Sequence, residues 1–230
     1  MSVLLLQLDY YENTSTKKYS VLKEYCQPTV KKYALENNMD YYCLVRPAKH
    51  MPTYNEKIKL YQDIFIHSQY SEYDQILYLD LDILIKRDSP NIFDISFEHL
   101  AGCLATKNRY ENGISYTQNI LKNNHDNFYS LINCSIRPNG GVLAFNKSRI
   151  NNAIFSPNLE DILEDEMYLS YKIAYKDLSF TIMSSKWNCR NLINNDHAYF
   201  IHLLTNLFND DGIDDTRGIE LISTTERLLK

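Results

Sequence analysis

Two aspartates separated by a single residue carry the clearest chemical meaning in this sequence. Asp80 and Asp82 directly follow residues 76–79, an apolar run that is typical of a buried strand. In an extended chain, side chains two residues apart point to the same side, roughly 7 Å from each other. The spacing therefore predicts two carboxylates on one face at the C-terminal end of a strand, which is where open α/β sheets bind their ligands.

This pair predicts a site for a divalent cation. Two carboxylates among apolar neighbours repel each other and lose hydration unless a cation lies between them or near them. Mg²⁺ and Mn²⁺ suit oxygen ligands, and they commonly take one or two carboxylates together with phosphate oxygens. The simpler alternative is that one aspartate faces water while the other caps a turn.

A second pair of acids lies on a predicted helix. On a 3.6-residue period, one stripe of this helix contains Ile162, Glu166, Leu169 and Ile173. Glu166 thus lies in the middle of the face expected to be buried, with Asp165 at its edge. A carboxylate in an apolar stripe is costly unless it meets a partner or faces an active-site cleft. Either acid is a candidate general base, and the alternative is a salt-bridged or solvent-facing glutamate.

The elements around these residues predict an α/β fold. Strands are expected at 3–8, 41–45 and 76–79, alternating with a helix at 16–37, broken near Pro28, and a helix that a capping box opens at 53–56. Such alternation predicts a mostly parallel sheet covered by helices. Later strands are expected at 83–85, 141–145, 180–184 and 199–204, with a helix from 156–157 to about residue 175. Residues 106–132 are polar without a clear period, and 209–217 are expected to form a loop.

Length, charge and cysteine usage limit the class of protein. The 230 residues suffice for one large α/β domain, and the net charge of −5 argues against a nucleic-acid binder, which usually carries a basic surface. No run approaches the roughly 20 apolar residues of a membrane helix, and the apolar run at 3–6 is too short for a signal sequence. The five cysteines have neither zinc nor disulfide spacing, which predicts reduced thiols in a soluble cytoplasmic protein.

The aspartate pair and its surroundings resemble a known enzyme family. Residues 73–82, Tyr-Asp-Gln-Ile-Leu-Tyr-Leu-Asp-Leu-Asp, look like the DxD segment of GT-A glycosyltransferases, and Lys57 matches a lysine frequently seen at the start of the preceding helix. The resemblance extends from the first strand to His202. It implies a single domain over 1–230 with the GT-A (Rossmann-like) fold, a mixed, mostly parallel sheet flanked by helices. Residues 1–105 would form the nucleotide-binding half and 106–230 the acceptor-binding half.

Three later segments match the family in order and spacing. Residues 139–142, Asn-Gly-Gly-Val, are similar to an Asn-x-Gly turn before a strand, and 165–172 are similar to the helix that points an acid at the acceptor hydroxyl. His202 lies in a segment that resembles the strand bringing a third metal ligand. One departure is the continuation His-x-x-Gly-x-x-Lys-Pro-Trp of glycogenin-like members, because residues 202–208 contain neither its glycine nor its phosphate-binding lysine.

The resemblance implies a nucleotide-sugar-dependent glycosyltransferase with Mn²⁺ or Mg²⁺ as cofactor. A hexose or deoxyhexose would move from a nucleotide diphosphate sugar, expected to be a UDP-sugar, to a hydroxyl of a glycan or other acceptor. The implied metal ligands are Asp80, Asp82 and His202, and the implied catalytic acids are Glu166 and Asp165. The donor is expected to contact Leu8, Asp9, Tyr10, Tyr11, Lys57, Asp80, Leu81, Asp82, Asn139 and Gly140. Tyr10 or Tyr11 would stack on the base, and Asp9 would accept a hydrogen bond from it.

Three alternatives share part of this pattern. A haloacid-dehalogenase-type phosphatase also has Asp-x-Asp after an apolar strand, but usually with Thr or Val where this chain has Leu84. A nucleotidyltransferase shares the fold and the metal, but usually has a glycine-rich loop after the first strand, and residues 9–18 contain no glycine. A catalytically inactive relative that binds a sugar nucleotide remains a further alternative.

Overall fold

The computed structural model describes most of the chain. The described residues are 1–9, 17–45, 53–105, 136–155, 165–175, 178–190, 196–203, 208–209 and 212–213. Tyr10 and Tyr11, the polar segment 106–132 and the helix start at 156–157 lie outside them. Residues 53–55 of the capping box are described by their backbone alone.

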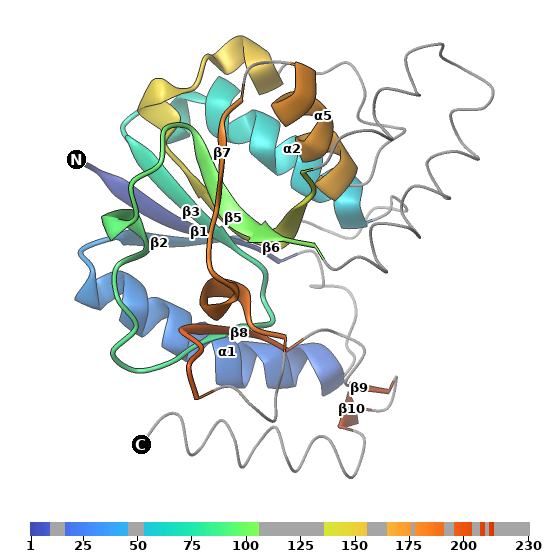
Figure 1. Cartoon of the computed structure of the whole chain (residues 1–230). Coiled ribbons are helices and arrows are strands. Elements are labelled where there is room, and N and C mark those ends of the chain that lie inside the picture. The colour runs from blue at the N-terminus through green and yellow to red at the C-terminus, as the bar shows by residue number, and fades with distance from the viewer. Residues whose placement is uncertain are drawn as a thin grey trace, which may run out of the picture.

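A six-stranded sheet forms the centre of the molecule (Figure 1), in the order β2-β1-β3-β6-β5-β7. Its strands are β1 (Val3–Asp9), β2 (Asp40–Val45), β3 (Gln75–Leu79), β5 (Leu100–Leu104), β6 (Pro138–Phe145) and β7 (Phe180–Ile182). β1 pairs in parallel with β2 and β3, and β5 pairs in parallel with β7, whereas β6 is antiparallel to β3 and β5. β6 is therefore the one reversed strand of this sheet, and the predicted mixed, mostly parallel sheet is confirmed.

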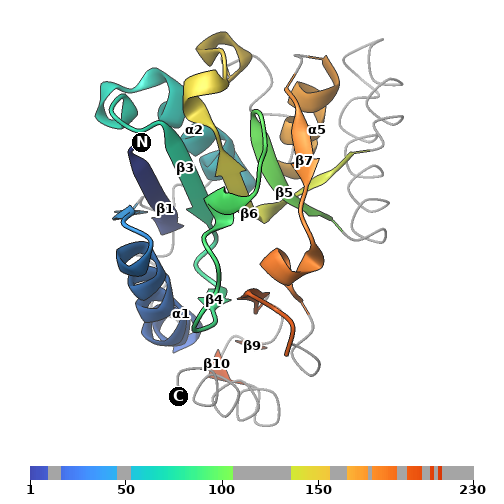
Figure 2. The ribbon, with the colours of Figure 1, turned by 60° about the vertical axis from the view of Figure 1, so that its left-hand side comes forward.

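Helices cover both faces of the sheet (Figures 1 and 2). They are α1 (Lys17–Glu36), α2 (Thr53–Ile66) and α5 (Asp165–Tyr175). Alternate residues of β1 divide between two hydrophobic cores, because successive side chains of a strand point to opposite faces. Leu4 and Leu6 pack with α2 and α5, and Leu5 packs on the opposite side with α1.

A two-stranded antiparallel sheet lies beside α1 and completes the second core. It pairs β4 (Ile83–Ile85) with β8 (Phe200–His202). Short 3₁₀ turns connect the larger elements: η1 (Ser68–Tyr70), η2 (Ile92–Asp94), η3 (Lys147–Arg149), η4 (Asn152–Phe155) and η5 (Ser185–Asn188). The short strands β9 (Phe208–Asn209) and β10 (Gly212–Ile213) pair with each other, so the loop predicted for 209–217 is wrong at these positions.

α1 differs from its prediction, because it continues through Pro28 instead of breaking there. A proline inside a helix removes one hydrogen bond and crowds the preceding turn. In this helix the apolar face buries Val30, Tyr33 and Ala34 in the second core, and that burial outweighs the local loss. The helix ends as predicted at Asn37 and Asn38, and Asn38 takes a positive φ of 53°.

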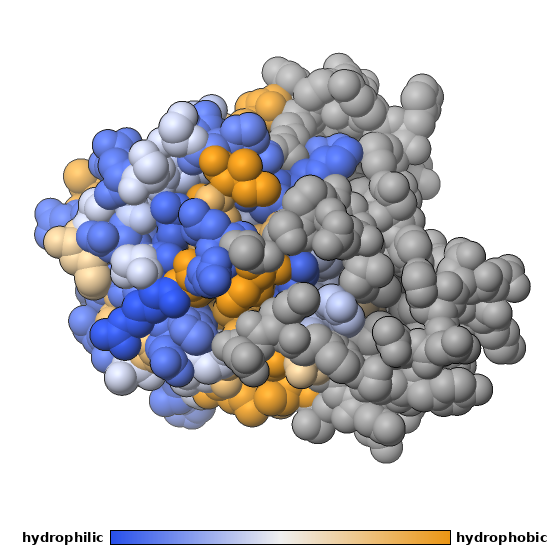
Figure 3. Space-filling model, turned by 90° about the horizontal axis from the view of Figure 1, so that it is seen from above, coloured by the Kyte–Doolittle hydropathy of each residue, from blue (hydrophilic) through white to orange (hydrophobic). Residues whose placement is uncertain are grey.

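The surface of the described residues has no broad apolar face in the view of Figure 3, where hydrophobic side chains form small groups between hydrophilic ones. Among these residues, no helix combines the length and the apolar character that crossing a bilayer requires.

Candidate active site

The two aspartates lie in the turn that joins β3 to β4. β3 ends at Leu79, and the amide of Ile83 donates to the carbonyl oxygen of Asp80 at 3.3 Å, which closes a tight turn over Asp80–Leu81–Asp82. The extended chain assumed in the sequence analysis is therefore wrong here. The turn is held in place because the amide of Asp80 donates to the carbonyl of Gly141 and the carbonyl of Asp82 accepts from the amide of Leu203, each at 2.9 Å.

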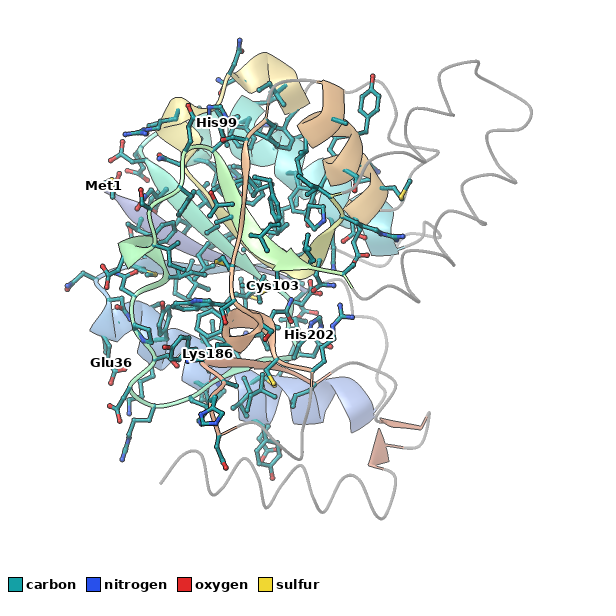
Figure 4. All side chains as sticks on the ribbon, viewed as in Figure 1. Met1, Glu36, His99, Cys103, Lys186 and His202 are labelled. Carbon is teal, nitrogen blue, oxygen red and sulfur yellow. The ribbon has the colours of Figure 1, made fainter. Side chains whose placement is uncertain are left out.

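His202 is brought to this turn by strand pairing. In the β4–β8 ladder His202 lies opposite Ile83, the residue after Asp82, and Figure 4 shows it near the end of the central sheet, on the side of α1. Its Nε2 lies 3.3 Å from Asp82 Oδ1 and 3.9 Å from Asp80 Oδ2. One ligand atom from each of the three side chains lies within 4.8 Å of the other two. Two carboxylates and an imidazole form a donor set that suits Mn²⁺.

Electrostatics keep Asp82 ionised. Burial alone would raise the pKa of this carboxyl, because the charged form loses hydration. The charge and hydrogen bond of His202, together with the charge of Lys57, outweigh that effect and hold the pKa of Asp82 below its usual value. Asp82 is therefore a buried anion.

Lys57 links the aspartate turn to the acidic pair of α5. Its Nζ lies 2.8 Å from Asp80 Oδ1, 2.9 Å from Asp80 Oδ2 and 3.4 Å from Asp165 Oδ2. It is 8 % exposed, so Lys57 is not a solvated surface lysine. Tyr78 adds a hydroxyl that donates to Asp80 Oδ1 at 2.7 Å. Both oxygens of Asp80 thus have partners from the chain itself.

The charges of this cluster do not cancel. Three carboxylates (Asp80, Asp82 and Asp165) face one lysine and one histidine. Even with the imidazole protonated, one negative charge remains among these five side chains. A bound cation would compensate this negative charge, so the charge balance of these five side chains favours a metal.

Two glycines of β6 allow the backbone to approach this cluster closely. A Cβ at position 140 would lie 2.2 Å from Asp165 Oδ2, and a Cβ at position 141 would lie 2.5 Å from His202 Cε1. Any side chain larger than hydrogen would displace one of these functional groups. The glycines are therefore required by close packing of β6 against the site, and not only by turn formation.

Glu166 points away from Lys57 and is fully enclosed. Its Oε1 accepts from Asn139 Nδ2 at 2.7 Å and from the amide of Gly140 at 3.4 Å. Its Oε2 lies 3.2 Å from Arg137 Nε. These two atoms form an ion pair, but their geometry is not that of a hydrogen bond. At 1 % exposure, Glu166 is bound within the protein, whereas Asp165 is the acid beside Lys57.

Comparison with known proteins bears on the fold. No protein-family description and no curated protein matches this sequence. Among solved structures, a glycosyltransferase involved in glycosylation of the major capsid of PBCV-1 superposes with a TM-score of 0.57 at 12 % identity, over 100 % of this chain and 99 % of that one. The galactosyltransferase LgtC in complex with donor and acceptor sugar analogs gives a TM-score of 0.55 at 12 % identity, over 100 % and 97 %. Mouse xyloside xylosyltransferase 1 gives 0.53 at 13 % identity, over 90 % and 99 %.

This chain has the GT-A fold. At these identities the comparison establishes the architecture and leaves the reaction to be argued from the site. The aspartate turn lies at the carboxyl end of a central strand of this GT-A sheet, in the position that the DxD resemblance implied.

The phosphatase alternative gains no support from the GT-A site. The three solved structures compared above are glycosyltransferases.

The first strand of the GT-A sheet brings further predicted residues near this edge. Asp9 ends β1, is 1 % exposed and forms an ion pair with Lys23 of α1 at 2.5 Å. Leu8 and Leu81 are buried apolar side chains, so polar contacts from these two positions would come from backbone. Tyr10 and Tyr11 lie outside the described residues.

Two residues of this GT-A site were missed in the sequence analysis. Arg137 pairs with Glu166, and Asn188 in η5 contacts both Asn139 and His202. Neither lies in a motif, because each matters through a partner far away in the sequence. Arg137 and Glu166 are 29 residues apart, and Asn188 and Asn139 are 49 residues apart. The buried glutamate was the available signal, since a buried carboxylate requires a cationic or hydrogen-bonding partner.

Proposed function

We propose that this protein is a metal-dependent glycosyltransferase that moves a hexose or deoxyhexose from a UDP-sugar to a hydroxyl of a glycan or other acceptor. The observation that carries the proposal is the convergence of Asp80, Asp82 and His202 at the carboxyl end of β3. Oxygen and imidazole donors in this number suit Mn²⁺ or Mg²⁺, with coordination positions left for phosphate oxygens. The uncompensated negative charge around Lys57 supports the same conclusion.

Asp80, Asp82 and His202 hold the cation in this proposal. When bound, a divalent cation supplies charge neutralisation to the departing diphosphate. Lys57 holds Asp80 in place with two short contacts and adds positive charge at the same edge. These groups are fixed by the fold before substrate binds, so little reorganisation is needed as charge develops.

The nucleotide is bound beside the end of β1. β1 and β3 are parallel neighbours with Gln7 opposite Leu79, so Asp9 lies at the same edge as the aspartate turn. Gln7 also donates from Nε2 to the carbonyl of Asp80 at 3.1 Å. We assign base recognition to Asp9, Tyr10 and Tyr11. Gly140, and Asn139 through its backbone, line the donor site on its other side, since the side chain of Asn139 is bonded to Glu166 and Asn188.

Asp165 is the acid that faces the reacting sugar and acceptor hydroxyl. It lies against Gly140 and beside Lys57, at the same cluster as the metal ligands. Glu166 is enclosed by Arg137 and Asn139, which leaves it without access to a hydroxyl. A carboxylate held near the acceptor can accept its proton or stabilise positive charge on the sugar.

A cytoplasmic location accompanies this function. The cysteines among the described residues, Cys26, Cys43, Cys103 and Cys189, are free thiols, which supports a reducing compartment.

The experiment measures Mn²⁺-dependent turnover of UDP-sugars by the full chain and by Asp82→Ala. Loss of this carboxylate is expected to lower turnover on the order of 10²-fold or more, as for removal of one preorganised charge-stabilising group. Asp63→Ala is the matched control, because Asp63 of α2 pairs with His67, just beyond the helix, and does not belong to the cluster. Turnover at the wild-type level in Asp82→Ala would disprove the metal assignment. UDP binding without turnover in the wild type would identify an inactive relative.

A further inference from the structure

A chain of buried side chains extends behind His202, on the side of the ring away from the carboxylates. His202 Nδ1 lies 2.9 Å from Asn188 Oδ1, and Asn188 Nδ2 donates to Asn139 Oδ1 at 2.6 Å. Asn139 Nδ2 in turn donates to Glu166 Oε1 at 2.7 Å. All four side chains are at most 6 % exposed, so water does not compete for these hydrogen bonds.

The glutamate fixes the direction of every bond in this chain. An ionised carboxylate only accepts hydrogen bonds, and the neighbouring Arg137 favours the ionised form of Glu166. Asn139 must therefore turn its NH₂ group towards Glu166 and its oxygen towards Asn188. The amide of Gly141 donates to the same oxygen of Asn139 at 3.1 Å, which independently fixes the orientation of this amide.

The orientation of Asn188 follows from that of Asn139. Its NH₂ group faces the oxygen of Asn139, so its own oxygen faces His202 Nδ1. An amide oxygen can only accept, and Nδ1 must therefore carry the proton. In the neutral ring the lone pair is then on Nε2, the nitrogen that lies 3.3 Å from Asp82 Oδ1. This is the nitrogen that a metal shared with Asp82 requires.

We infer that Glu166, Asn139 and Asn188 form a relay that fixes the tautomer and ring orientation of His202 for metal binding. Asn139 and Asn188 are thereby positioning residues, and Glu166 acts through them on the metal site instead of transferring protons with substrate. The inference rests on the proposed function, because it assumes that His202 is a metal ligand.

The first test measures the affinity of the full chain for Mn²⁺, using electron paramagnetic resonance of the free ion. Asn188→Ala is expected to weaken binding by roughly 10–100-fold, the usual effect of removing a partner of a metal ligand. Asn146→Ala is the matched control, since Asn146 is also buried but contacts Ser148; its affinity should stay within about 2-fold of wild type. In a His202→Ala background, Asn188→Ala should have no further effect, because residues acting through one group are not additive.

The second test needs no metal. In the ¹⁵N-histidine-labelled, metal-free protein, measured at alkaline pH so that the ring is neutral, the NMR signals of His202 should show a proton on Nδ1 and none on Nε2. Asn188→Ala should lose this preference, because no acceptor then faces Nδ1. Thermal melting of each variant shows that it is folded.

The outcomes separate this inference from the proposed function. An unprotonated Nδ1 in the wild type overturns the relay, and so does a loss of Mn²⁺ affinity by Asn188→Ala that persists in the His202→Ala background. A wild-type protein that binds no Mn²⁺ overturns the proposed function instead. In that case the NMR measurement alone decides whether the relay orients the ring.

Discussion

A single methyl group at position 140 tests whether Asp165 takes part in the reaction. In Gly140→Ala, the new Cβ would lie 2.2 Å from Asp165 Oδ2 and 3.2 Å from its Cγ. Ordinary van der Waals contact begins at 3.4 Å, so the carboxylate must withdraw by about 1 Å. The atoms that clash belong to a side chain that can rotate, and the backbone at Gly140 is not in the left-handed region. The fold should therefore tolerate the substitution.

The expected effect is large in activity and small in stability. Displacement of a positioned group by about 1 Å costs on the order of 10²-fold in rate, which corresponds to about 2.7 kcal/mol of transition-state stabilisation. Withdrawal of Asp165 also lengthens its 3.4 Å contact with Lys57. The affinity for Mn²⁺ should change little, because the added methyl group does not clash with Asp80, Asp82 or His202.

The assay compares kcat/KM for sugar transfer, Mn²⁺ affinity and thermal stability in two glycine variants. Gly102→Ala is the matched control, because a Cβ there would meet Leu143, Val142 and Phe180 in the sheet, at 3.1–3.3 Å. This overpacking should cost about 1–3 kcal/mol of stability without changing kcat/KM of the folded enzyme. If Gly140→Ala keeps kcat/KM within about 3-fold of wild type, Asp165 is not positioned for the reaction and the reasoning fails.

Two further predictions concern buried groups. Arg137→Met should lower the free energy of unfolding by about 3–5 kcal/mol, because it leaves the carboxylate of Glu166 buried without its cation. Urea denaturation measures this loss, and adding Glu166→Gln should recover part of it; an additive double variant would contradict the pairing. Burial raises the pKa of Cys103 to about 12, so at pH 8 its thiol stays protonated. Iodoacetamide should leave Cys103 unmodified in the native protein and modify it after unfolding, as read by mass spectrometry; rapid native modification would contradict its burial.

The sequence was most informative where local pattern and tertiary environment agree. The apolar runs of β1 and β3 are buried strands, since both strands lie inside a sheet covered on both faces. The alternation of strands and helices correctly predicted a mostly parallel sheet, and the family resemblance implied that it is mixed. The DxD resemblance and its spacing to residue 202 named three side chains that the structure brings within 4.8 Å.

The sequence was less informative where distant contacts decide the conformation. β5 (Leu100–Leu104) was not predicted, because Leu-Ala-Gly-Cys-Leu has neither strict alternation nor β-branched residues. Its pairing with β6 on one side and β7 on the other makes it a strand. The turn at Asp80 was likewise missed, because hydrogen bonds to Gly141 and Leu203 help to hold the chain there. Neither partner is visible in the local sequence.

The reversed strand explains why residues so far apart in sequence reach one site. Parallel strands bring their carboxyl ends to one edge of the sheet, and β3 delivers Asp80 there. An antiparallel strand brings its beginning to the same edge, and the pairing of Leu79 with Val142 places Asn139, Gly140 and Gly141 just beyond the end of β3. These three residues meet the relay, Asp165 and His202 respectively. The first residues of β6, 139–141, therefore position Glu166, Asp165 and His202. Substitutions at Gly140 and Gly141 should separate metal binding from sugar transfer more cleanly than changes to the ligands themselves. Gly140 lies against Asp165, the acid assigned to sugar transfer, whereas Gly141 lies against the metal ligand His202.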